Sequence, residues 1–426
     1  MGVPARRLVL FSGLSRLMNR EPNLLSSSSP PPTRKELARL AGLRCVQEAF
    51  EWFAAHEPEL TELQMKVTAI PAPPFHEQQR SAWMLERFSE FGLLESQLDG
   101  IGNVIGHLPG SEAGPFVAVS AHIDTVFTET RIEVRRDGSR LIGPGVADNG
   151  AGLVALLALA GAMRAAKLRT RLPLLLLANV GEEGEGDLRG MRHFFDDARW
   201  QGRIASLLAL DGAGTDTIVT EALGSLRFEV SFSGPGGHSW SDFGFPNPIV
   251  LLARVIDALS RIDLPRHPRT TLNVGTIQGG TSVNAIPQAA AMRVDVRSTD
   301  PQNIAAVERQ LHAAVERVKG ELEASSGVEA GIRIIGNRPA AELPRGSAIL
   351  EVLRAVDAHL GIKAQEHCAS TDANIPLSLG IPAVALGAGG LGARAHTLHE
   401  WFIPRERDLA LKRILLAVLA LAGMAE

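Results

Sequence analysis

The chain has 426 residues, of which 45% are hydrophobic and 21% are charged, so it is long enough for two or three domains with large buried cores. Lys and Arg number 43 against 47 Asp and Glu, and this balance excludes the basic excess typical of nucleic-acid-binding proteins. Tyr is absent and only 5% of residues are aromatic, which argues against a stacking platform for single-stranded nucleic acid. Two cysteines, Cys45 and Cys368, favour reduced thiols over a disulfide framework.

The sequence gives little sign of targeting. Arg6 and Arg7 precede a short apolar run, 8–11, that weakly resembles a secretory signal, but the run ends after four residues and further arginines follow. Serines and prolines fill 26–32, a composition that cannot pack. We expect residues 1–33 to form a disordered leader. No apolar stretch reaches 18 residues, so we expect no contact with a membrane and a cytoplasmic location.

From Arg34 onward the sequence alternates between helical and strand patterns. Helices are expected at 34–56, at about 75–91 after a proline-rich breaker, and at 149–166. Apolar strands are expected at 116–121, 172–180 and 205–210, and they end at His122, at Gly181 to Glu183, and at Asp211. Continuously apolar strands that alternate with helices indicate a sheet buried on both faces. Ligand sites of such sheets lie at the carboxyl ends of the strands, where these polar residues fall.

Between 221 and 336 the pattern changes to an α+β type. Alternating strands at 226–232, 271–277 and 289–296 are separated by helices at 246–260 and 301–322. A strand at 383–386 and a helix at about 405–422 then return to the first type. We therefore predict a first domain built from 34–220 and 337–426, with 221–336 inserted as a separate domain.

Metal-ligand residue types recur at the predicted strand ends. In His122-Ile123-Asp124 the two polar residues share one face of a strand, so the Asp124 carboxylate could accept a hydrogen bond from His122 and orient it as a ligand, although a surface pair is the simpler alternative. The segment 143–152 is Gly-rich and carries Asp148. It lacks the spacing and the Gly-Lys-Ser/Thr ending of a phosphate loop, and Asp148 would repel an anion. A cation ligand fits this segment better.

Two further segments belong to this set. Glu182 and Glu183 are adjacent and point in different directions, so one could bind a metal while the other faces a bound water, unless they form an ordinary acidic loop. Segment 395–400 contains two histidines without the helical His-Glu-x-x-His spacing, and either could be a ligand. No G-x-S-x-G elbow is present. Together with Asp211, these residues suit two zinc ions bridged by one carboxylate.

The motifs, in order from about residue 60 to the C-terminus, resemble the dinuclear zinc peptidase family that includes peptidase T, aminoacylase, acetylornithine deacetylase, succinyl-diaminopimelate desuccinylase, carnosine dipeptidases and glutamate carboxypeptidase. The matching segments are 122–126, 145–150, 182–183, Asp211, 236–239 and 396–400. The resemblance implies a three-layer α/β/α catalytic domain with an inserted α+β two-layer lid or dimerisation domain.

The resemblance also implies a role for each residue. Asp148 would bridge two metals, with His122 and Asp211 completing one site and Glu183 and His396 the other; the family spacing favours His396 over His399. Glu182 would be the general base and Asp124 the partner of His122. His238 would reach a neighbouring active site and contact the developing oxyanion. Substrate-binding positions would be Asn284 and Arg297, with Thr371 and Asp372 in a loop near the substrate.

The function implied is zinc-dependent hydrolysis of an amide bond in a small peptide. Aspartate at position 211 resembles the aminopeptidases and dipeptidases of the family, whereas deacylases and carboxypeptidases usually carry glutamate. Removal of the acyl group from an N-acyl amino acid is the main alternative, and a non-catalytic metal-binding protein is a third. We expect two Zn²⁺ per subunit, with Co²⁺ or Mn²⁺ possible, and a homodimer without nucleic-acid or membrane partners.

Overall fold

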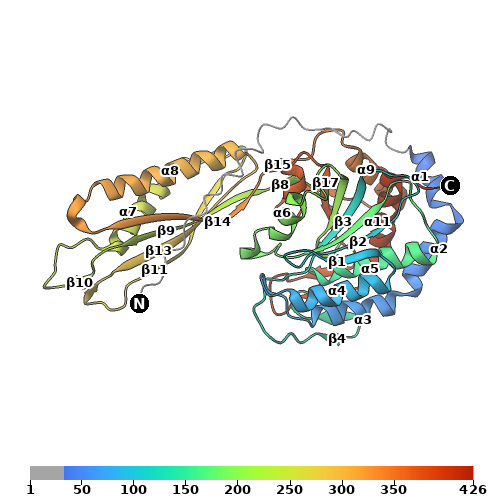
Figure 1. Ribbon diagram of the computed structural model, residues 1–426, viewed down its shortest axis with the longest axis horizontal. Coiled ribbons are helices and arrows are strands. Elements are labelled where there is room, and N and C mark those ends of the chain that lie inside the picture. Colours follow the sequence, from blue (N-terminus) through green and yellow to red (C-terminus); the bar gives the residue numbers. More distant parts are fainter. Residues whose placement is uncertain (1–32, 426) are drawn as a thin grey trace.

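The computed structural model describes residues 33–425 and has two lobes (Figure 1). The larger lobe contains both ends of the described chain, and the smaller lobe is built from the middle of the sequence. Of the leader expected at 1–33, only Thr33 is described, and its side chain caps the first helix. Among the described residues, no helix is long and apolar enough to cross a membrane.

The larger lobe is organised around a nine-stranded mixed sheet. Its strand order is β1-β2-β6-β3-β7-β17-β8-β15, and β16 pairs with β8. The strands are β1 Leu94–Leu98, β2 Val104–Leu108, β3 Phe116–His122, β6 Leu174–Asn179, β7 Ile204–Leu210, β8 Thr217–Ala222, β15 Ala341–Glu342, β16 Gln365–Ala369 and β17 Ala383–Leu386. The central strands β6, β3, β7 and β17 are parallel, so their carboxyl ends meet at one edge.

The central strands are apolar because the sheet is covered on both faces. Every residue of β3, β6 and β17 is buried. Helix α5 packs against β3, and α2, α3 and α11 pack against α5. The helices of this lobe are α1 Arg34–Ala41, α2 Arg44–Ala55, α3 Glu57–Thr68, α4 Gln78–Glu90, α5 Gly150–Ala165, α6 Arg189–Asp196, α9 Ala348–Leu360, α10 Asn374–Ser378 and α11 Arg407–Ala422.

The prediction of one continuous helix at 34–56 is wrong, because the structure has two helices there, α1 and α2. Gly42 ends α1 by donating its backbone N–H to the Ala38 carbonyl, and Leu43 is extended before α2 begins. Helix α3 follows directly and was not predicted, although Pro58 in its first turn and acidic residues beside it are typical helix-start signals.

The smaller lobe has two layers. Its four-stranded antiparallel sheet has the order β11-β13-β9-β14, and α7 Pro248–Ser260 and α8 Pro301–Gly320 pack on one face (Figure 1). The strands are β9 Gly224–Ser233, β11 Thr271–Gly279, β13 Ala289–Ser298 and β14 Glu329–Arg338. Alternate residues of β9 and β13 are buried in a core separate from that of the larger lobe. At its tip, β10 Gly237–His238 pairs with β12 Ala285–Ile286.

Candidate metal centre

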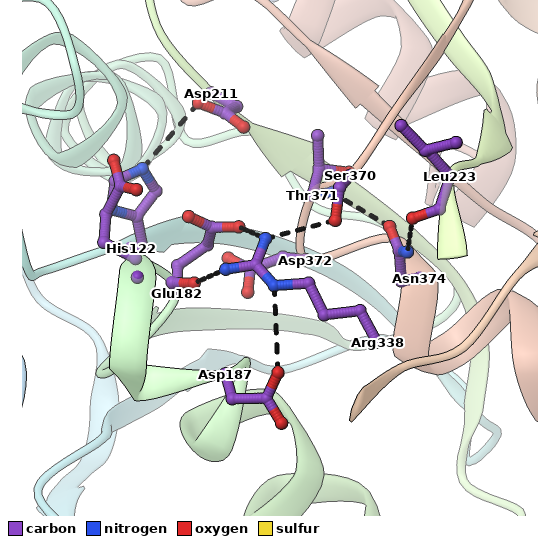
Figure 2. Close-up of polar contacts among 12 residues, drawn as sticks. His122, Glu182, Asp187, Asp211, Leu223, Arg338, Ser370, Thr371, Asp372 and Asn374 are labelled. Atoms are coloured by element: carbon purple, nitrogen blue, oxygen red, sulfur yellow. Dashed lines mark hydrogen bonds and ion pairs between the residues drawn. The ribbon is translucent and has the colours of Figure 1, made fainter. Parts of the chain in front are cut away.

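The expected ligands converge at the carboxyl edge of the large sheet. His122 is the last residue of β3, and Asp211 directly follows the neighbouring parallel strand β7. His122 Nε2 lies 3.0 Å from Asp148 Oδ1 and 3.7 Å from Asp211 Oδ1. The dashed contact between His122 and Asp211 is drawn in Figure 2. Two strand ends and one loop thus supply one histidine and two carboxylates.

Asp148 lies between two groups of ligands. Its second oxygen, Oδ2, is 3.2 Å from His396 Nε2, and that nitrogen is 2.9 Å from Glu183 Oε1. Candidate ligand atoms of His122, Asp148 and Glu183 all lie within 4.8 Å of one another. One carboxylate oxygen therefore faces His122 and Asp211, while the other faces His396 and Glu183. Of the two histidines in 395–400, it is His396 that reaches the cluster.

The charges of the cluster fit bound cations. Burial alone would lower the pKa of His122, but its hydrogen bond to Asp148 and the nearby Asp211 carboxylate raise it well above its usual value. Hydrogen bonds to Asp148 and Glu183 raise the pKa of His396 to about 10. Although burial opposes it, hydrogen bonds from both histidines hold the pKa of Asp148 far below its usual range. The protons on the histidines supply the positive charge that a bound metal ion would otherwise provide. The nitrogen and oxygen donor set suits zinc.

A buried glutamate fixes the loop that carries Asp148. Glu400 Oε1 accepts backbone N–H bonds from Ala147 at 2.7 Å and from Asp148 at 2.8 Å, and its Oε2 accepts one from Gly145 at 2.9 Å. Its side chain is completely buried. Because Glu400 follows His396 by four residues, one short segment provides a ligand and also holds the backbone of the central carboxylate. From the sequence, Glu400 is visible only as the last residue of the segment 396–400, and this role was not predicted.

A small sheet joins these two loops. Its order is β18-β19-β5-β4, with β4 Arg135–Asp137, β5 Arg140–Ile142, β18 Leu391–Ala393 and β19 Trp401–Ile403. Strand β5 precedes the Asp148 loop, and β18 and β19 flank His396. Gly145 in the loop has φ +79°, and a Cβ there would lie 2.6 Å from Thr125 Cγ2. A glycine is therefore required at this close approach.

The expected bond from His122 to the Asp124 carboxylate is not formed. His122 Nδ1 lies 3.0 Å from the backbone carbonyl oxygen of Asp124 and 3.8 Å from its Oδ1. The carboxylate instead accepts the backbone N–H groups of Glu182 at 2.9 Å and Glu183 at 2.8 Å. Asp124 lies beyond the end of β3, where strand alternation no longer sets its direction. It still fixes the His122 ring, through its backbone, and it also positions both glutamates.

Glu182 forms a buried ion pair that the sequence did not reveal. Arg338, the last residue of β14, places Nη1 3.0 Å from Glu182 Oε1 and 3.1 Å from Ser370 Oγ, and its Nη2 donates to the Glu182 carbonyl. Figure 2 shows the guanidinium between Glu182, Ser370 and Asp187. Burial raises the pKa of Glu182 well above its usual value, although Arg338 opposes this shift. Arg338 ends an ordinary strand pattern, so only its position in the fold distinguishes it.

The loop with Thr371 and Asp372 lies beside this pair. Asn179 Nδ2 donates to Asp372 Oδ2 at 2.8 Å, whereas Asp372 Oδ1 is buried and has no hydrogen-bond partner among the described residues. Burial raises the pKa of Asp372 to about 7. Thr371 is held by Asn374, whose Oδ1 accepts the Thr371 N–H at 2.9 Å (Figure 2). The loop is therefore held by hydrogen bonds from Asn179 and to Asn374.

Three expected site residues lie on the smaller lobe instead. His238 is exposed at the tip, where its Nδ1 accepts the Trp240 N–H at 3.2 Å. Asn284 bonds to Ser282, and Arg297 Nε donates to Asp295 at 2.7 Å. Within the described part of the chain, no hydrogen bond or ion pair joins these three side chains to the metal-ligand cluster. A role for them in this active site needs a second subunit or a movement of the lobe.

Comparison with known proteins agrees with this arrangement. YqjE of Bacillus subtilis is 24% identical over 362 residues, which span 81% of this chain and 93% of YqjE. A probable carboxypeptidase of Aspergillus clavatus is 32% identical over 204 residues, covering 43% of this chain and 44% of that protein. The crystal structure of aminopeptidase PepT from Bacillus cereus matches with a TM-score of 0.69 at 20% identity, over 86% of this chain and 99% of that one, and so shares the fold.

A family model matches most of the folded chain. The model of Peptidase family M20/M25/M40 aligns with residues 118–421, a range that contains every ligand of the cluster. The match bears out the expected resemblance, and with it a hydrolytic enzyme of α/β fold. The chain belongs to Peptidase family M20/M25/M40.

Proposed function

We propose that this protein is a dinuclear zinc-dependent exopeptidase that cleaves an amide bond in small peptides. The observation that carries the proposal is the position of Asp148, whose two carboxylate oxygens face two separate groups of ligands. His122 and Asp211 would hold one ion, and His396 and Glu183 would hold the other. When bound, zinc supplies Lewis acidity and lowers the pKa of a water molecule toward neutrality.

Glu182 is the general base in this proposal. It directly precedes the ligand Glu183, its backbone N–H is fixed by Asp124, and its buried carboxylate has a raised pKa. A carboxylate of this kind accepts a proton from the attacking water and returns it to the leaving amine. The ion pair with Arg338 holds the carboxylate in place until the substrate arrives.

Arg338 is our candidate for binding the carboxylate end of the peptide. Its guanidinium is 6% exposed and lies next to the general base, and a planar fork of this type pairs with carboxylates in a bidentate manner. Arg297, which the resemblance places at a substrate-binding position, pairs instead with Asp295 on the smaller lobe. We therefore assign the carboxylate to Arg338.

We further propose a homodimer in which His238 of the partner subunit donates a hydrogen bond to the developing oxyanion. Because His238 Nδ1 accepts backbone N–H groups, its Nε2 is left as the donor. The long edge strand β11 is mostly exposed and offers a pairing surface. Light scattering tests this part, and a monomer at assay concentration would contradict it.

The substrate class is tested by comparing matched compounds. Zinc-loaded protein is incubated with dipeptides, tripeptides and the corresponding N-acetyl amino acids, and the released amine is measured. Cleavage of peptides with a free amino terminus supports the exopeptidase. Turnover of the N-acetyl compounds alone would identify a deacylase, which is the main alternative that the sequence suggested. Two bound zinc ions without turnover of either class would show that the substrate class is wrong.

A further inference from the structure

A cavity of about 820 Å³ lies beside the metal centre. Its walls come from the turn that leads into α4, from the segment after Asp124, and from the segment after Glu183. Gly184 directly follows the ligand Glu183, so the cavity adjoins the cluster. The Thr125 N–H donates to the Ala72 carbonyl at 2.9 Å and ties the first two walls together.

One wall is apolar and rigid. Pro71, Pro73 and Pro74 fix the backbone of the turn, and Phe75 follows them with φ +73°. A bulky residue adopts this conformation only when its surroundings enforce it, and such residues gather at functional sites. Phe75 is 52% exposed, yet the Arg189 guanidinium lies 5.0 Å from its ring centroid, and Glu77 holds Arg189 at 2.6 Å. The ring is thus kept in place while it faces the cavity.

The charges of the cavity exclude acidic groups. Its lining contains the carboxylates of Glu129 and Glu185 and the imidazole of His76, but no lysine or arginine. Arg293 of the smaller lobe pairs with Glu185 at 3.0 Å, whereas Glu129 has no ion pair among the described residues. An acidic side chain would meet an uncompensated carboxylate, while an apolar one would gain contact with the prolines and Phe75.

We propose that this cavity selects peptides by binding a large apolar or aromatic side chain of the amino-terminal residue and rejecting an acidic one. The inference rests on the proposed exopeptidase function. Arg338, which we assign to the carboxylate end, does not line the cavity. In this proposal, a peptide whose carboxylate binds Arg338 places its amino-terminal residue in the cavity.

The test compares kcat/KM for phenylalanyl-glycine, glycyl-glycine and glutamyl-glycine with zinc-loaded protein. We expect the aromatic peptide to exceed glycyl-glycine by roughly 10- to 100-fold, the size of a pocket contact, and glutamyl-glycine to be the poorest substrate. Phe75→Ala should reduce the aromatic preference, and Glu129→Lys should raise glutamyl-glycine relative to phenylalanyl-glycine by about three- to tenfold. Leu94→Ala, an exposed apolar residue on β1, is the matched control and should leave all ratios unchanged.

Two outcomes would overturn the proposal: an aromatic preference below about twofold in the wild type, or a preference that Phe75→Ala leaves intact. If no peptide is cleaved but N-acyl amino acids are, the exopeptidase assignment fails separately. The same variants are then compared on N-phenylacetyl-glycine and N-acetyl-glycine. A preference for the aromatic acyl group that depends on Phe75 would support the cavity as the apolar subsite. Equal rates for the two compounds would contradict it.

Discussion

The loops that carry the candidate ligands and the tip of the smaller lobe both contain candidate site residues, yet they are built in different ways. Around Asp148, two buried carboxylates tie the loops together: Glu400 holds the Asp148 backbone, and Asp124 holds the backbone of both glutamates. At the tip, His238 is exposed and its bonds lie within its own turn. A site that binds cations needs fixed donors, whereas a group that acts on another subunit has to be exposed.

The lobes also contact each other next to the catalytic residues. Arg227 of β9 donates to the Gly184 carbonyl at 2.8 Å, and Asn337 of β14 donates its N–H to Asp187. These bonds fall on the turn that follows Glu183, and Arg338 is the next residue after Asn337. The smaller lobe therefore contacts Glu182, the proposed general base, through one strand, β14. The four predictions below separate the contributions of the two regions.

Replacing the general base should give the largest effect. Glu182→Ala is expected to lower kcat by about 10²- to 10⁴-fold because the proton acceptor is lost. Metal content, measured by elemental analysis on the same sample, should stay at the wild-type value, since Glu182 is not among the proposed ligands. Loss of metal in this variant would overturn its assignment as the base.

The tip of the smaller lobe should affect turnover but not metal binding. His238→Ala is expected to lower kcat by about 10²- to 10³-fold, as removal of an oxyanion donor does, with zinc affinity unchanged. His312→Ala, an exposed histidine on α8 of the same lobe, is the control and should behave like the wild type. Equal activity of both variants would show that His238 acts in neither subunit.

Replacement of Glu400 should weaken metal binding itself, unlike the two replacements above, which should lower kcat without changing metal binding. In Glu400→Gln an amide NH₂ must face at least one of the three backbone N–H groups, so the Asp148 loop shifts. We expect zinc affinity to fall by about 10- to 100-fold, measured by chelator competition. Asp357→Asn removes a buried carboxylate that pairs with Arg413 between α9 and α11, and it serves as the control. An affinity loss of the same size in both variants would point to general destabilisation.

The smallest effect concerns pH. The pKa of His396 is raised to about 10 in the metal-free cluster by Asp148 and Glu183, so at lower pH this histidine carries a proton that zinc must displace. Zinc affinity should therefore rise with pH, by about tenfold per unit for each displaced proton, until the pKa is passed. Calorimetry in buffers with different ionisation enthalpies counts the released protons, and binding without proton release would contradict the prediction.

The sequence predicted the four central strands of the large sheet, β3, β6, β7 and β17, because they are buried on both faces and form unbroken apolar runs. It did not predict β1, β2, β8, β15 or β16. Strand 383–386 corresponds to β17, and His122 and Asp211 lie at the ends of predicted strands. Short helices were harder to predict. The break between α1 and α2 depends on Gly42 and an extended Leu43, and helical periodicity continues across both.

The five candidate ligands could be proposed from the sequence because each is a metal-binding residue type at a strand end or in a short motif, and the resemblance to a family implied a role for each. The residues that support those ligands could not be predicted from the sequence. Glu400 lies 252 residues from the Asp148 N–H that it accepts, and Arg338 lies 156 residues from Glu182. Both belong to otherwise ordinary segments. Such contacts follow from loop packing at the sheet edge and leave no local pattern.

The sequence by itself determined the chemistry available to this protein: an α/β sheet, a set of nitrogen and oxygen ligands, and two adjacent glutamates. These follow from residue types and short-range periodicity, which act over a few residues. Only the tertiary structure decided which oxygen of Asp148 faces which histidine, that Arg338 and not Arg297 meets the general base, and where the apolar cavity lies. Those features depend on segments brought together by burial, whose positions in the sequence carry no information about their distance in the fold.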